Sequence, residues 1–209
     1  MPPVEEAVNK GIPVITADLK LESDLVSTFI GTNNIEAGKI AGNFAAEYID
    51  EHLGGEAEVD ILLWESSPTQ QDRAKGFIEG VEALPGVEVV AQLPGNDRAT
   101  SMSSAQSMLQ SHPDLDIIFA TNEGGVLGAM NAMEIAENDK VQLIGFDITQ
   151  ELANSIKEDK VLATVAQLPK LMGEKAVESA LSVLNGEELD PVIDLPAELV
   201  TKENVDDFN

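Results

Sequence analysis

The sequence predicts an α/β fold with a doubly wound parallel sheet. Short apolar runs rich in strand-forming residues alternate along the chain with amphipathic helical patterns, which is typical of a parallel sheet covered by helices. The run at 117–120 is apolar throughout, as in a strand buried on both faces, and Val126, Met130 and Met133 then recur at helical spacing. With 209 residues, 43% of them hydrophobic, the chain can bury the core of one large domain or two small ones.

The first part of the chain is expected to form two strands between two helices. The pattern predicts, in order, a helix over 2–10 ended by Gly11, strands over 12–16 and 26–30, and a helix from 35 to a stop at 54–55. In the long helix, Gly38 and Gly42 are expected to allow close packing against a sheet.

From residue 59 onward the alternation becomes regular. We expect strands over 59–64, 87–93, 117–120, 141–146 and 162–166. Helical patterns follow them over 74–81, 102–109, 126–133, 152–156 and 172–184, and short extended pieces at 192–193 and 199–200 close the chain. This order predicts right-handed crossovers between parallel strands.

The composition excludes several classes of function. Aspartate and glutamate number 38 against 12 lysines and arginines, for a formal net charge of -26, and such a surface repels the phosphate backbones of nucleic acids. The acidic residues are scattered, so we interpret them as solvated faces, with adaptation to high salt as an alternative hypothesis. The absence of cysteine rules out disulfides, a thiol nucleophile and thiolate metal sites, and we expect neither a metal nor a cofactor.

Polar side chains follow the predicted strands at the points where the strands end. Carboxyl ends of parallel strands lie at one edge of a sheet, where open α/β sheets bind ligands. Carboxylates and amides there suit a ligand rich in hydroxyl groups, because carboxylates accept hydroxyl hydrogens and amides both donate and accept. Arg73 and Arg98, the only arginines, fall at or near helix starts on the same edge. The strand-end candidates are Asp18, Thr32, Asn96, Asn122, Asp147 and Gln167.

Each of these residues also has a structural interpretation. Any one of them can be a helix cap or a turn former. Taken alone, Asn122 is equally well explained as the cap of the helix that follows it. The convergence of several such residues on one edge favours a binding site.

Seven segments of the sequence carry a family pattern. They are 11–18 (GIPVITAD), 31–42 (GTNNIEAGKIAG), 72–77 (DRAKGF), 119–123 (FATNE), 144–147 (IGFD), 163–169 (ATVAQLP) and 199–204 (LVTKEN). Together, across essentially the whole chain, they resemble the ribose-binding-protein-like group of sugar-binding proteins that serve bacterial ABC importers.

The resemblance implies two similar α/β lobes joined by three crossings, with a sugar bound between them. Family members begin with two more βα units, so Met1 resembles an internal methionine of a longer protein. On this comparison, residues 1–31 and 168–196 are the remnant of an N-terminal lobe, and residues 32–167 and 197–209 are a complete C-terminal lobe. We expect weakened sugar affinity and self-association through the incomplete lobe.

The resemblance also implies roles for individual residues. By this resemblance, Asp18, Asn122 and Asp147 would bind sugar hydroxyls, and Arg73 would donate hydrogen bonds to the sugar. Gln167 would lie at the hinge. Leu19 stands where ribose binders typically carry arginine, and Asn96 stands where they carry an aromatic residue. Both departures weigh against ribose itself as the ligand.

The leading interpretation is a non-catalytic module that binds a small sugar or related polyol and presents it to the membrane permease of an ABC importer. The full-length form is then expected to be periplasmic or extracytoplasmic, although the sequence shows neither a signal peptide nor an apolar run of transmembrane length. Catalysis is disfavoured, because Asp18 and Asp147 look like hydrogen-bonding partners. The alternative is the ligand-sensing core of a sugar-responsive regulator or a chemoreceptor partner.

Three further features are given structural interpretations. The glycines at 124, 125 and 128 lack the spacing of a nucleotide-binding fingerprint. His52 and His112 are expected to be exposed at helix ends. Trp64 is expected to pack in the core, with stacking on a sugar as the alternative.

Overall fold

The computed structural model of the protein describes residues 2–21 and 23–208. It confirms the predicted α/β fold. The chain divides into two compact units: unit 1 comprises Met1–Asn33 and Gln167–Ala197, and unit 2 comprises Asn34–Ala166 and Glu198–Asn209. Met1, which the sequence comparison takes as an internal methionine, lies outside the described residues. Within the described part, no helix is long and apolar enough to cross a membrane.

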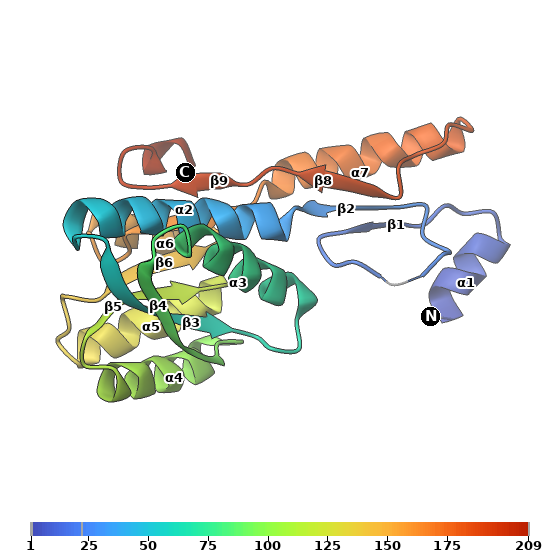
Figure 1. Cartoon of the computed structure of the whole chain (residues 1–209). Coiled ribbons are helices and arrows are strands. Elements are labelled where there is room, and N and C mark those ends of the chain that lie inside the picture. The colour runs from blue at the N-terminus through green and yellow to red at the C-terminus, as the bar shows by residue number, and fades with distance from the viewer. Residues whose placement is uncertain (1, 22, 209) are drawn as a thin grey trace. The chain divides into compact units, whose positions relative to one another are not determined.

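Unit 1 is built on a small parallel sheet in the order β1-β2-β8. Helix α7 packs on β1 and β2. Strand β1 is an edge strand (Figure 1). A small cluster of Ile30, Met172 and Leu195 forms its buried core. The elements of this unit are α1 (Pro2–Asn9), β1 (Ile15–Ala17), β2 (Thr28–Thr32), α7 (Pro169–Leu184) and β8 (Val192–Leu195).

Unit 2 contains a six-stranded sheet in the order β4-β3-β5-β6-β7-β9, in which only β9 pairs antiparallel. Its strands are β3 (Glu56–Leu63), β4 (Gly86–Pro94), β5 (Leu115–Ala120), β6 (Gln142–Phe146), β7 (Ala163–Ala166) and β9 (Glu198–Val200). Its helices are α2 (Asn34–His52), α3 (Pro68–Val81), α4 (Arg98–Ser111), α5 (Glu123–Ile135), α6 (Gln150–Lys157) and the short 3-10 helix η1 (Val205–Phe208).

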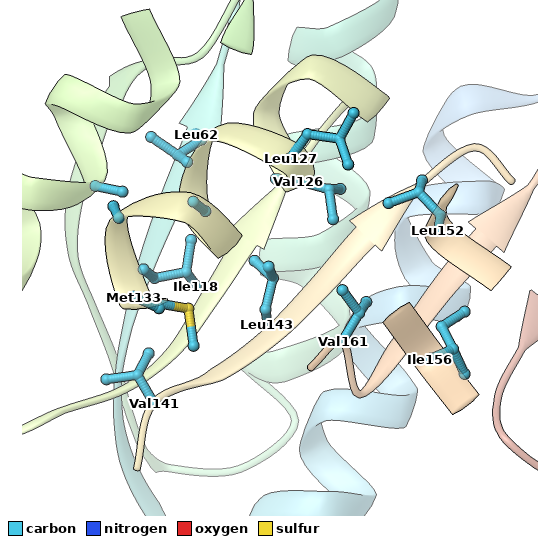
Figure 2. Close-up of a cluster of buried hydrophobic side chains, with 14 of the residues drawn as sticks. Leu62, Ile118, Val126, Leu127, Met133, Val141, Leu143, Leu152, Ile156 and Val161 are labelled. Carbon is cyan, nitrogen blue, oxygen red and sulfur yellow. The ribbon is translucent and has the colours of Figure 1, made fainter. Parts of the chain in front are cut away.

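Helices cover both faces of this sheet, because successive side chains of its buried strands point to opposite sides. One face packs against α4, α5 and α6, and Figure 2 shows Ile118 and Leu143 of the sheet beside Val126 and Met133 of α5. On the other face, the rings of Phe77 in α3 and Phe119 in β5 stack with their centroids 4.1 Å apart. The unit is therefore a doubly wound fold whose core is mostly aliphatic, with Phe77, Phe119 and Phe146 also fully buried.

Helices α2 and α3 touch backbone to backbone through glycines. A Cβ added to Gly42 of α2 would lie 2.2 Å from the carbonyl oxygen of Phe77, and one added to Gly76 of α3 would lie 2.0 Å from that of Ile35. A Cβ on Gly38 would lie 2.1 Å from the carbonyl oxygen of Arg73. The glycines of α2 therefore serve helix–helix contact, and the expectation that they pack against the sheet is wrong.

His112 is partly buried, contrary to expectation, whereas His52 is exposed. His112 lies just past the end of α4, and its Nδ1 atom is 2.8 Å from Oδ2 of Asp60, which is fully buried in β3. Burial raises the pKa of the Asp60 carboxyl, and the neighbouring imidazole opposes that shift. The pair thus ties the end of α4 to the middle of the sheet.

Replacing Gly42 by alanine is expected to lower the free energy of unfolding by about 1–3 kcal/mol, because the new methyl group forces α2 and α3 apart. Asn43→Ala, at the next and exposed position of α2, is the matched control and is expected to change stability by only a few tenths of a kcal/mol. Urea denaturation followed by circular dichroism measures both. An equal loss in the two variants would contradict the helix contact.

Candidate functional site

The carboxyl ends of strands β3, β5 and β6 lie side by side at one edge of unit 2. Asn122 follows β5 and Asp147 follows β6, and these two strands are direct neighbours. Arg73 reaches the same edge from α3, since its Nη1 donates to the carbonyl oxygen of Thr121 at 2.9 Å. Arg73, Asn122 and Asp147, three of the binding residues predicted from the sequence, therefore lie at the same edge of the unit 2 sheet.

Asn122 is the N-cap of α5. Its Oδ1 accepts a hydrogen bond from the backbone N–H of Gly125 at 2.8 Å, which fixes the orientation of the amide. Its Nδ2 donates to Oε1 of Gln70 at 2.8 Å and to the carbonyl oxygen of Gly95 at 2.6 Å. Both amide hydrogens are thereby engaged, and a second lone pair of Oδ1 is the part of the side chain that can still accept from a ligand.

Gln70, which the sequence analysis missed, is a buried link between two strand ends. Its side chain is 9% exposed, and its Oε1 accepts three hydrogen bonds. The donors are the backbone N–H of Trp64 at 2.9 Å, the hydroxyl of Thr121 at 2.8 Å and the amide of Asn122. Its place in a polar run at the start of α3 gave no sign of burial.

Arg73 is charged but only 4% exposed, and several contacts hold its side chain in place. Its Nε donates to Oδ1 of Asn34, at the start of α2, at 2.9 Å. Its guanidinium carbon lies 3.7 Å from the centroid of the Phe146 ring, a cation–π contact. A planar cation fixed in this way offers directed N–H donors to oxygen atoms at the strand ends.

Asp147 adopts the left-handed backbone conformation, with φ of 71°. Its N–H donates to the carbonyl oxygen of Val165 in β7 at 2.9 Å, and its carbonyl oxygen accepts from the hydroxyl of Thr164. Aspartate tolerates this conformation better than most residues. The bend ends β6 abruptly and leaves the carboxylate at the sheet edge.

Unit 1 repeats this arrangement at Asp18. There φ is 68°, and the N–H after β1 donates to the carbonyl oxygen of Ile30 in β2 at 2.9 Å. The other two candidates of unit 1 contact each other, because the hydroxyl of Thr32 donates to Oε1 of Gln167 at 2.9 Å. Leu19, beside Asp18, is exposed.

Asn96 is exposed, and its amide donates to Oδ2 of Asp97 at 2.9 Å. Asp97 caps α4, and hydrogen bonds from the backbone N–H and hydroxyl of Thr100 hold its pKa below the usual range. Asn96 therefore supports the start of a helix, and its loop is joined to the site through the bond from Asn122 to Gly95.

Trp64 lies just after β3 with 48% of its surface exposed, so the expectation that it packs in the core is wrong. Among the described residues, no cluster of three or more histidine, aspartate or glutamate side chains is arranged to hold a metal ion. What the edge offers is a set of hydrogen-bonding groups, with the half-exposed Trp64 at the neighbouring end of β3.

A family model described as the periplasmic binding protein domain matches residues 1–188. The ribose import binding protein RbsB of Escherichia coli is 32% identical over 200 residues, covering 96% of this chain and 67% of that protein. RbsB of Bacillus subtilis is 34% identical over 202 residues, covering 95% and 64%. The chain thus spans about two thirds of the length of these curated relatives.

Among solved structures, AraP, an arabinose binding protein from Geobacillus stearothermophilus, matches with a TM-score of 0.91 and 29% identity. The match covers 100% of this chain and 74% of that one. These similarities confirm the resemblance that the sequence motifs indicated. The chain belongs to the periplasmic binding protein family.

Proposed function

We propose that the chain binds a small sugar or related polyol without converting it, as the solute-binding component of an ABC importer. The observation that carries the proposal is the edge of unit 2 where Arg73, Asn122 and Asp147 meet at the ends of β5 and β6. The similarity to ribose and arabinose binding proteins supports this class of ligand.

The residues at this edge have the chemistry that a polyol needs. The carboxylate of Asp147 accepts hydrogens from two hydroxyls, Arg73 donates in a plane, and Asn122 accepts through Oδ1. We assign hydroxyl contacts also to Asp18, Thr32 and Gln167 at the strand ends of unit 1. Delivery to a membrane permease implies an extracytoplasmic location, which we propose for the chain.

The first test is a calorimetric titration of the whole chain with D-ribose, L-arabinose, D-allose and D-galactose, with sucrose as a larger control sugar. Saturable binding of at least one monosaccharide is expected, because the strand-end groups match closely spaced hydroxyls. The sugar is expected to be recovered unchanged by NMR after incubation. Consumption of the sugar, or no heat with any of them, would overturn the proposal.

Asp147→Gly is expected to weaken sugar binding by about tenfold or more, because charged hydrogen bonds to ligand hydroxyls are lost. Glycine adopts positive φ without strain, so the free energy of unfolding is not expected to fall. Asp159→Gly is the matched control, since Asp159 is also left-handed, with φ of 59°, but follows α6 on the surface. Equal affinity losses in the two variants would contradict the role of Asp147.

We further propose that unit 1 pairs with a second copy of the chain through α7. Val177, Leu181 and Leu184 recur at helical spacing on one face of α7 and are 63%, 57% and 67% exposed. Lys170 lies near the start of α7, and Glu187 and Glu188 follow its end. Antiparallel pairing of two α7 helices therefore brings each basic end against the acidic end of the other copy.

Light scattering across protein concentrations is expected to show a dimer whose dissociation constant rises at least about tenfold in Leu181→Glu, because the acid enters the apolar contact twice. Ile135→Glu is the control, as Ile135 is 64% exposed but lies on α5 of unit 2. A wild-type chain that stays monomeric at every concentration would exclude the pairing.

A further inference from the structure

Trp64 is the only tryptophan of the chain and lies at the edge of the proposed site. The other large aromatic side chains near this edge are fully buried: Phe77, Phe119 and Phe146 have no exposed surface. Trp64 instead keeps 48% of its surface exposed at the carboxyl end of β3. A large ring left half in water beside hydrogen-bonding groups is available to contact a ligand.

The position of Trp64 is fixed relative to the polar groups of the site. Its backbone N–H donates to Oε1 of Gln70 at 2.9 Å, and its carbonyl oxygen accepts from the N–H of Ser67 at 2.9 Å. The same Gln70 oxygen accepts from the amide of Asn122 at 2.8 Å. One buried acceptor atom therefore holds the backbone of Trp64 and the side chain of Asn122 as neighbours.

The chemistry of a sugar requires both kinds of contact. Its hydroxyls form a polar rim, which Asp147, Asn122 and Arg73 suit, but its ring also carries C–H groups that form an apolar face. Burying that face against a flat aromatic ring removes apolar surface from water and adds dispersion contacts. Phe146 cannot serve, since it is buried and its ring faces the guanidinium of Arg73.

We propose that the indole ring of Trp64 packs on the C–H face of the bound sugar, and that Gln70 is the positioning residue that aligns it with Asn122. The inference rests on the proposed function, because it names the residue that recognises the apolar face of the same ligand. The ring of Trp64 would also supply the aromatic contact that the family resemblance implies at position 96, where this chain has asparagine.

Because the chain has a single tryptophan, its fluorescence reports directly on this contact. In titrations with D-ribose and L-arabinose, emission is expected to shift to shorter wavelength with the same midpoint as the calorimetric titration. Quenching by acrylamide is expected to fall about twofold or more at saturation, because the sugar covers the exposed ring.

Two sets of variants separate recognition from folding. Trp64→Ala is expected to weaken binding at least about tenfold, whereas Trp64→Phe, which keeps a flat ring, costs about threefold or less. Ile135→Ala, another exposed apolar residue of unit 2, is the control and leaves the affinity unchanged. Gln70→Met removes the shared acceptor oxygen, so it is expected to weaken sugar binding and to change acrylamide quenching of Trp64 in the free protein. Gln70→Glu keeps an acceptor oxygen, so its sugar affinity and its quenching are expected to match those of the wild type.

The outcomes distinguish this inference from the proposed function. If calorimetry detects a sugar while the emission of Trp64 stays unchanged and Trp64→Ala binds as tightly as the wild type, the inference is overturned and the proposed function stands. If no sugar produces heat, both are overturned. If Trp64→Ala loses affinity while its free energy of unfolding stays within about 0.5 kcal/mol of the wild type, the contact is supported.

Discussion

The backbone contact between α2 and α3 is the constraint on which the rest of unit 2 depends. Glycines at 38, 42 and 76 let the two helices approach until a single added methyl group would overlap a carbonyl oxygen. That approach sets Asn34, at the start of α2, against Arg73 of α3. Because Arg73 also donates to the end of β5, the spacing of two helices on one face of the sheet fixes a cation at its edge.

The same helix carries a second buried polar residue three positions earlier. Gln70 and Arg73 lie on one face of α3, and both bind Thr121 at the end of β5, through its hydroxyl and its carbonyl oxygen respectively. Buried polar groups are costly unless their hydrogen bonds are made, and a network in which they are made is rigid. Hydrogen bonds within the chain therefore hold the side chains of the unit 2 site in place.

Sequence patterns predicted the parts of this structure that depend on neighbouring residues. The apolar run at 117–120 lies inside β5, and Asn122 caps α5 as the polar residue before a helical pattern should. Contacts between distant segments left no such trace. Gln70 meets Asn122 across 52 positions, and Asp60 likewise meets His112, so neither burial followed from local periodicity. The exposure of Trp64 was missed for the same reason, since a strand-end aromatic packs or protrudes according to residues far along the chain.

Asp18 and Asp147, the two aspartates with positive φ at the ends of strands, link backbone conformation to the proposed site. Glu137 and Asp159 also have positive φ, but each follows a helix, where the left-handed conformation is a common way to end the turn. Asp18 and Asp147 instead follow parallel strands, and each donates its N–H to the next strand in its own unit. Glycine would adopt this bend at lower cost, by about 1 kcal/mol per position, so conformation alone does not explain the aspartates. The hydroxyl contacts proposed for the two carboxylates account for aspartate at these positions, whereas the turn alone does not.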